Sequence, residues 1–353
     1  MSQYNFDGHK LFYQFEPTYK LLTNQPVFPL YVEFSPVGNC NHRCMFCAYD
    51  YMGYKPRKLD TGNTIRSIKE FAELGTKAIL FAGEGEPLLH PDFVDMIKAC
   101  EECNVDSGIY TNGAMLTHAK ADELLNRLTF LRVSFNAGTK ENYKQIHGRD
   151  DYDTVIKNLS YATEQKRKHG LKADIGLQFV VIPENIDTVI DLAKTGRELG
   201  VDYLAIKPFV QHSSQNYNFE QNFKIDEIEG ILDEAAQYST DNYHVIARKE
   251  SFRKYHQRTY DHCLSLPLFC VVLSNGSVYS CGPHLDKEEF FYGNINENSV
   301  KEIMNGERRQ RILEFAKHTL DCKTQCMPNC RLDAINRSVW ELTYPTVKHI
   351  NFI

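Results

Sequence analysis

The chain has 353 residues, of which 42% are hydrophobic and 24% charged, a composition typical of a globular protein with a sizeable core. Its formal net charge of −6 argues against a broadly basic surface for nucleic acid. Because it has neither a signal-peptide pattern nor an apolar stretch of about 18 residues, we expect a cytoplasmic protein that does not bind a membrane.

Strand-like and helix-like segments alternate over the first 210 residues, which predicts a parallel α/β sheet with crossover helices. The predicted strands are residues 30–35, 78–82, 105–110, 130–135, 175–182 and 203–207. The predicted helices are residues 64–74, 91–102, 120–127, 152–169 and 186–199. Six such repeats are too few to close an ordinary eight-stranded barrel.

Three cysteines follow the first predicted strand, at Cys40, Cys44 and Cys47. Three thiolates on one loop can hold three irons of a 4Fe-4S cluster and leave the fourth iron open to a substrate or cosubstrate. A zinc site is the alternative, but zinc requires four ligands in a closed tetrahedron, and no fourth cysteine or well-spaced histidine follows.

This spacing, with Phe46 directly before the third cysteine, resembles the signature loop of radical S-adenosylmethionine (SAM) enzymes. The resemblance implies an open, partial (β/α)6 TIM barrel and SAM bound to the open iron. It also implies cleavage of SAM to methionine and a 5'-deoxyadenosyl radical. The electron would come from a reductant such as flavodoxin or ferredoxin.

A glycine-rich segment with a carboxylate directly follows the second predicted strand, at Gly83, Gly85, Glu86 and Pro87. Glycines let the backbone approach a ligand closely, and a carboxylate can accept hydrogen bonds from an ammonium group. The segment resembles the motif that holds the methionine amino group of SAM in this family. A tight turn without a ligand is the alternative.

Polar residues also stand at the ends of later strands. The resemblance implies that Ser134 and Asn136 contact SAM, although turns and helix caps use the same residue types. Lys207 ends the sixth strand, where a buried lysine would need an anionic partner. The substrate or SAM could supply that partner.

Six further cysteines follow residue 260, and the spacing of Cys263, Gly276 and Cys281 resembles the SPASM and twitch auxiliary-cluster domains of this superfamily. Asn275-Gly276 predicts a hairpin turn between apolar runs. Two fully ligated clusters would need eight cysteines, so we expect one auxiliary 4Fe-4S cluster. The favoured ligands are Cys263, Cys281, Cys326 and Cys330, with Cys270 and Cys322 as alternatives. A zinc site in the same place is the other interpretation.

The expected organisation is an N-terminal extension (residues 1–29), a radical SAM partial barrel (30–210), a helical linker region (211–260) and a small C-terminal iron-sulfur domain (261–353). A cysteine left unligated, Cys270 or Cys322, could return a hydrogen atom to a substrate radical and so act as a catalytic residue.

The favoured function is hydrogen abstraction from a small polar metabolite of sugar, aminocyclitol or nucleotide-sugar type, followed by two-electron oxidation assisted by the auxiliary cluster. Radical epimerisation and modification of a peptide or protein side chain are the alternatives. A non-catalytic iron-sulfur carrier is less favoured because it would need no SAM pocket.

Overall fold

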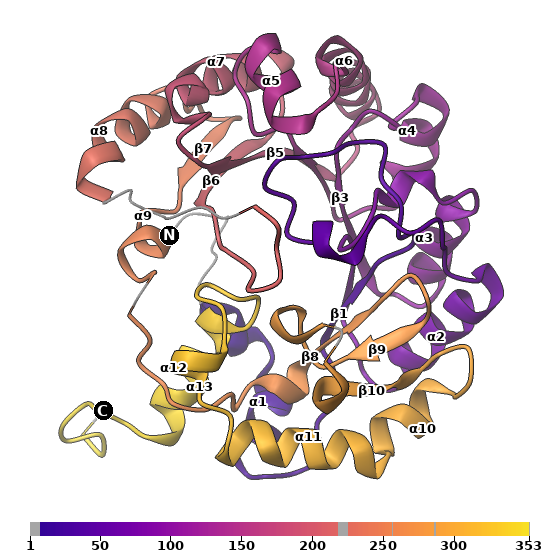
Figure 1. The fold of residues 1–353 in the computed structure, drawn as a ribbon, viewed down its shortest axis with the longest axis vertical. Coiled ribbons are helices and arrows are strands. Elements are labelled where there is room, and N and C mark those ends of the chain that lie inside the picture. The colour runs from indigo at the N-terminus through magenta and orange to yellow at the C-terminus, as the bar shows by residue number, and fades with distance from the viewer. Residues whose placement is uncertain (1–7, 218–224, 256, 286, 353) are drawn as a thin grey trace.

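One continuous sheet forms the centre of the molecule. The computed structural model describes residues 8–217, 225–255, 257–285 and 287–352. The ten strands of the sheet lie in the order β10-β9-β8-β1-β2-β3-β4-β5-β6-β7. The strands from β8 through β1 to β7 pair in parallel, whereas β9 pairs antiparallel with both β8 and β10. Helices α2 to α7 surround the outside of this curved sheet (Figure 1). The expectation of an α/β partial barrel is confirmed.

The elements have the following bounds. The strands are β1 (Tyr31–Phe34), β2 (Ala78–Phe81), β3 (Asp106–Thr111), β4 (Phe130–Ser134), β5 (Asp174–Val181), β6 (Tyr203–Pro208), β7 (His244–Ala247), β8 (Phe269–Val272), β9 (Ser277–Tyr279) and β10 (Phe291–Asn294). The α-helices are α1 (Phe15–Leu22), α2 (Thr61–Glu73), α3 (Phe93–Glu102), α4 (His118–Leu124), α5 (Lys140–His147), α6 (Tyr152–His169), α7 (Val189–Leu199), α8 (Ile225–Ala236), α9 (Lys249–Arg253), α10 (Val300–Asn305), α11 (Glu307–His318), α12 (Cys322–Gln325) and α13 (Asp333–Thr343).

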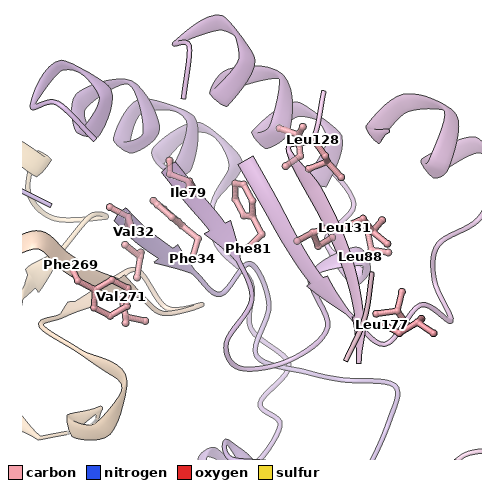
Figure 2. Close-up of a cluster of buried hydrophobic side chains, with 14 of the residues drawn as sticks. Val32, Phe34, Ile79, Phe81, Leu88, Leu128, Leu131, Leu177, Phe269 and Val271 are labelled. Atoms are coloured by element: carbon pink, nitrogen blue, oxygen red, sulfur yellow. The ribbon is translucent and has the colours of Figure 1, made fainter. Parts of the chain in front are cut away.

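The main core lies between the sheet and the outer helices (Figure 2). The ring of Phe34 on β1 lies 6.1 Å from that of Phe71 on α2, and Phe81 on β2 lies 5.3 Å from Phe93 on α3. Fully burying each such ring stabilises the fold by about 1.5–3 kcal/mol. Because side chains alternate along a strand, the neighbours of these residues, such as Glu33, point to the inner face of the sheet.

Four strands extend the sheet beyond the six that the sequence predicts for the barrel, and two of these four, β7 and β8, pair directly with the outer strands of that set. The first is β7, which pairs with β6 and lies in the region that we expected to be a helical linker, between α8 and α9. The second is β8, which pairs in parallel with β1, with Cys270 opposite Val32. The C-terminal region therefore continues the sheet of the barrel. Parts of residues 1–29 and 211–260 lie outside the described residues.

The predicted hairpin is present between β8 and β9. Gly276 has a φ of +84°, and its backbone N–H donates to the Leu273 carbonyl at 2.8 Å. A Cβ at this position would come within 2.3 Å of the Asn296 amide nitrogen, which is one reason why glycine occupies the turn.

The N-terminal extension packs against the C-terminal part of the chain. Leu11 and Val27 share a small apolar cluster with Leu264, Leu268 and Val339, the last from α13. None of the helices in the described part of the chain is both long and apolar enough to cross a bilayer.

Candidate active site

The loop that carries Cys40, Cys44 and Cys47 follows β1 and is held against the end of α5. Backbone N–H groups of Arg43 and Met45 donate to the carbonyls of His147 and Ile146, at 3.0 and 2.9 Å. The sulfur of Cys44 lies 3.1 Å from Nδ1 of His147. Sequence reasoning did not identify α5, although this helix positions the loop.

His147 is a neutral acceptor for the Cys44 thiol. Its Nε2 lies 2.7 Å from the Phe135 carbonyl, so Nε2 carries the proton and Nδ1 is left to accept. Burial, together with the neighbouring His42, lowers the pKa of His147 to about 3, which keeps the ring uncharged. The ligand atoms of His42, Cys44 and His147 all lie within 4.8 Å of one another.

The environment of the three thiols suits a bound cation. Burial, followed by the negative charge of the nearby Glu86, raises the pKa of Cys40 to about 12. Burial also raises the pKa values of Cys44 and Cys47, and the neighbouring thiolates add to the shift of Cys44. A positively charged iron cluster would reverse this balance and stabilise the thiolates. The residues present therefore fit such a cluster.

Glu86 joins the glycine-rich segment to the end of β3. Its carboxylate accepts hydrogen bonds from the Thr111 hydroxyl at 2.6 Å, from the Asn112 backbone N–H at 2.8 Å and from the Leu88 N–H at 3.1 Å. The side chain is buried, and burial raises its pKa. Pro87 begins the short 3-10 helix Pro87–Leu89, which Glu86 caps.

The glycines of this segment bring it against the cysteine loop. Gly83 and Gly85 both have positive φ, and a Cβ at Gly85 would come within 2.5 Å of the Val37 and Asn39 carbonyl oxygens. The backbone N–H of Glu86 donates to that same Asn39 carbonyl at 3.0 Å. The structure thus brings together two of the predicted motifs at the carboxyl ends of neighbouring strands, where parallel α/β folds place their active groups.

Asn112 adds a second link between β3 and the cysteine loop. Its amide nitrogen donates to Asn41 Oδ1 at 2.7 Å and lies 3.8 Å from the sulfur of Cys40. The other two predicted SAM contacts, Ser134 and Asn136, lie at the end of β4 and just after it. Ser134 is half-buried at the end of β4, with Gln178 opposite it on β5. Asn136 has a φ of 54°, and its side-chain oxygen accepts from the Val180 N–H at 3.0 Å. This bond ties the Asn136 side chain to the backbone of β5, and a contact of Asn136 with SAM stays a prediction.

Phe46 is a packing residue in the structure. It is buried in a cluster with Ile146, Val180, Ile182 and Phe209, and its ring lies 6.0 Å from that of Phe209. Phe46 therefore holds the cysteine loop, through apolar contacts, against the carboxyl ends of β5 and β6 and the end of α5.

A second group of thiols lines one cavity in the C-terminal region, made of Cys263, Cys281, Cys322, Cys326 and Cys330. The structure thus brings together the four favoured auxiliary ligands and one of the two alternatives. His284 also lines the cavity, and its Nε2 lies 3.5 Å from the sulfur of Cys326. Burial lowers the pKa of His284 to about 4, so this ring is neutral beside the thiols.

Cys270 lies elsewhere. It is fully buried within β8, is absent from the lining of the cavity, and has the charged Arg309 near it. The alternative that Cys270 is a ligand of the auxiliary cluster therefore does not agree with its position, because Cys270 lies outside the lining of the thiol cavity. The tight packing of β8 against β1 explains its position, since Cys270 is paired with Val32 in the central sheet.

Glu84 links the glycine-rich segment to the C-terminal hairpin, a contact that sequence reasoning missed. The carboxylate is buried and accepts from the backbone N–H and the hydroxyl of Ser274, at 2.8 and 2.6 Å. It also forms an ion pair with Arg57 at 3.0 Å. The only signal in the sequence is a second glutamate within the glycine-rich segment.

Lys207 is half-buried at the end of β6. Burial and the positive charges of Arg331, Arg248 and Arg132 lower the pKa of Lys207 to about 7. The charged form of Lys207 is therefore costly at this position, and an anionic partner from the substrate or SAM stays a prediction.

Comparison with known proteins identifies two domain types. Residues 34–196 match the model of the radical SAM superfamily, and residues 263–331 match that of SPASM, an iron-sulfur cluster-binding domain. The chain is similar to dTDP-4-amino-4,6-dideoxy-D-glucose ammonia-lyase of Streptomyces venezuelae, at 27% identity over 53% of this chain and 41% of that protein. It is also similar to GTP 3',8-cyclase of Saccharophagus degradans, at 26% identity over 61% of this chain and 65% of that protein. The chain thus spans less than two thirds of the length of each.

The fold has solved counterparts. The structure of Streptococcus suis SuiB bound to S-adenosylmethionine matches 95% of this chain and 79% of that one, with a TM-score of 0.67 and 16% sequence identity. At this level of identity the likeness concerns the fold alone.

Proposed function

Since this chain combines a radical SAM domain with a SPASM iron-sulfur domain, we propose that it abstracts a hydrogen atom from a small polar metabolite and then oxidises the resulting radical through an auxiliary cluster. Its cofactors are SAM and 4Fe-4S clusters. When bound, they supply a carbon-centred radical and an electron acceptor, which no side chain of the protein could supply.

In this proposal Cys40, Cys44 and Cys47 hold the first cluster. Glu86 would accept hydrogen bonds from the ammonium group of SAM, because it lies beside the cysteine loop and burial favours a charged partner for a carboxylate there. Asn112 would orient the cluster side of the pocket through its contacts with Asn41 and Cys40. The reductant would be a flavodoxin or ferredoxin.

The observation that carries the oxidation step is the position of the second thiol group. Arg331 lines the cavity of the five thiols, and its guanidinium also forms an ion pair with Glu33 on the inner face of β1, at 3.1 Å. The auxiliary site therefore borders the barrel interior, where a substrate would lie. We favour Cys263, Cys281, Cys326 and Cys330 as its ligands.

Epimerisation is the second candidate. Five thiols line the cavity where one cluster needs four, so one of them is left over to return a hydrogen atom. Of the two residues considered for this role, Cys322 lines the cavity, whereas Cys270 is enclosed in the core. If epimerisation occurs, we therefore expect Cys322 rather than Cys270 to donate the hydrogen atom.

The relatives broaden the choice of substrate. One is named for a nucleotide sugar and another for GTP, and these names support a small metabolite. The SuiB fold has also been determined with a precursor peptide, which keeps peptide modification as an alternative.

Reduction of the reconstituted protein with SAM and candidate metabolites tests the proposal. We expect 5'-deoxyadenosine to form, and a triple alanine variant at Cys40, Cys44 and Cys47 to lose about four irons and all SAM cleavage. Oxidation predicts a product that is two electrons poorer than the substrate. A product of unchanged mass that carries one solvent deuterium would assign epimerisation instead. Cleavage by the triple variant would refute the assignment of the first cluster.

A further inference from the structure

Arg258 lies against the loop that carries two of the favoured auxiliary ligands, Cys326 and Cys330. Its guanidinium donates to the carbonyls of Cys326 and Met327, at 3.3 and 2.5 Å. Only 9% of the Arg258 side chain is exposed. Arg258 comes from the segment before Cys263, so the chain brings a buried cation from one segment to the ligand loop of another.

The charge of Arg258 acts on three thiols of the cavity. A hydrogen bond with a neighbouring thiol is the largest cause that raises the pKa of Cys322 and of Cys326, and burial is the largest for Cys330. The positive charge of Arg258 lowers the pKa values of all three. This direction agrees with the contacts of its guanidinium, because a nearby cation stabilises negative charge on sulfur.

Asp333, the first residue of α13, offsets the charge of Arg258 only in part. Its carboxylate accepts from Nε of Arg337 at 2.9 Å and from the hydroxyl of Tyr260 at 2.7 Å. Nε of Arg258 lies 3.8 Å from the same carboxylate, which is beyond hydrogen-bond distance. The backbone N–H of Asp333 donates to the Cys330 carbonyl at 3.0 Å, so this residue also adjoins the ligand loop.

A buried cation beside the ligands has a predictable effect on a cluster. A 4Fe-4S cluster gains one negative charge when it is reduced, and its potential depends on the charges around it and on its exposure to solvent. Because little water screens a buried charge, a cation there favours the reduced form. In the proposed oxidation the substrate radical passes one electron to the auxiliary cluster and one proton to water. A flavodoxin or ferredoxin then takes the electron from the cluster.

We propose that Arg258 raises the reduction potential of the auxiliary cluster and so makes this cluster a better electron acceptor for the substrate radical. The inference rests on the proposed function, and it gives a role to a residue outside the cysteine motifs. Arg258 acts through the cluster, so it is not itself a catalytic residue.

A redox titration of the triple alanine variant at Cys40, Cys44 and Cys47 tests the proposal, since this protein would carry only the auxiliary cluster. Electron paramagnetic resonance follows the reduced cluster. In this background Arg258→Gln should make reduction about 10-fold less favourable, which corresponds to a potential about 59 mV lower for a one-electron couple. Glutamine keeps an N–H donor for the loop carbonyls but has no charge. Arg258→Lys keeps the charge and should restore most of the potential.

Arg337→Gln is the matched control. The Arg337 guanidinium lies 5.8 Å from the centre of the Tyr260 ring, where that of Arg258 lies 5.2 Å away, and both arginines pair with Asp333. The backbone acceptor of Arg337 is the Gln257 carbonyl, at 2.6 Å, in place of the ligand loop. Its substitution should therefore change the potential less than Arg258→Gln does. An equally large shift would overturn the assignment to Arg258.

Asp333→Asn should shift the potential in the opposite direction. This variant leaves Arg258 in place and removes the negative charge beside Cys330, so the cluster should become easier to reduce. It decides the test if Arg258→Gln loses its iron, because a potential that does not rise would overturn the proposal. An unchanged potential in an Arg258→Gln protein that keeps about four irons would also overturn it.

The potential is measured without SAM cleavage or substrate, so the two proposals can fail separately. The expected shifts in a protein that forms no oxidised product would refute the proposed function and leave the role of Arg258 in place. Oxidised product together with unchanged potentials would do the reverse. A cavity that holds zinc would give no redox signal and would overturn both.

Discussion

Glu84→Gln should loosen the contact between the glycine-rich segment and the C-terminal hairpin. The Glu84 side chain is 2% exposed, and one of its oxygens accepts two hydrogen bonds from Ser274, at 2.8 and 2.6 Å. The other oxygen pairs with Arg57 at 3.0 Å. Glutamine keeps one acceptor oxygen but removes the charge.

The free-energy cost of the substitution follows from the hydrogen bonds whose acceptor is no longer charged. A hydrogen bond to a charged group contributes about 1.5–3 kcal/mol, and a neutral one about 0.5–1.5 kcal/mol. The substitution should therefore cost about 1–2 kcal/mol, which corresponds to roughly a 5- to 30-fold change in a local opening equilibrium. Glu84→Ala should cost more, because it leaves the Ser274 N–H and the Arg57 guanidinium without this acceptor.

Hydrogen exchange measures the effect directly, since the Ser274 amide is itself a donor to Glu84. We expect its exchange to accelerate by that factor in cluster-loaded protein, with little change in the central strands. Glu288→Gln is the control, because Glu288 pairs with Arg308 at the surface and is 75% exposed. Ser274 exchange within twofold of the unaltered protein in the Glu84→Gln variant would refute the reasoning.

Three further predictions concern the cofactor sites. Glu86→Gln should weaken SAM binding about 10- to 100-fold while both clusters keep their iron, because it removes the charge opposite the SAM ammonium group. Unchanged affinity in a SAM titration would show that the glycine-rich segment only forms a turn and does not bind SAM. Cys281→Ala should lower the iron content and stop product formation while SAM is still cleaved. Cys270→Ala should keep all the iron, because Cys270 lies outside the thiol cavity, and iron analysis that shows a loss would contradict that placement.

The sequence predicts the barrel well because its signals are local. Each predicted strand overlaps an observed one, since an apolar run followed by an amphipathic helix repeats along the chain. The short strand His244–Ala247 escapes prediction because four residues give little periodicity. Helix α5 has only eight residues, and its role in holding His147 against Cys44 depends on contacts that are distant in sequence.

The sequence predicts which motifs form the candidate site, but it does not predict which side chains contact one another there. Cysteine spacing identifies both thiol groups, but it cannot separate Cys322, which lines the cavity, from Cys270, which is paired within the central sheet. The sequence of a strand end also does not show whether its polar side chain bonds the backbone, as the side chain of Asn136 does with the Val180 N–H. The neighbours of Lys207 come from β4, from the chain after β7 and from residue 331, and no local pattern connects them.

The parallel pairing of β1 with β8 has a consequence for how this protein can be divided. Backbone hydrogen bonds of one sheet span the junction between the region of the first thiol group and that of the second, so the spacing of the two sites is set by strand geometry and not by a tether. Deleting the C-terminal region would expose the backbone donors and acceptors of β1 as an open edge. Such an edge invites pairing with other chains, so we expect a truncated barrel to aggregate and not to persist as an independent module.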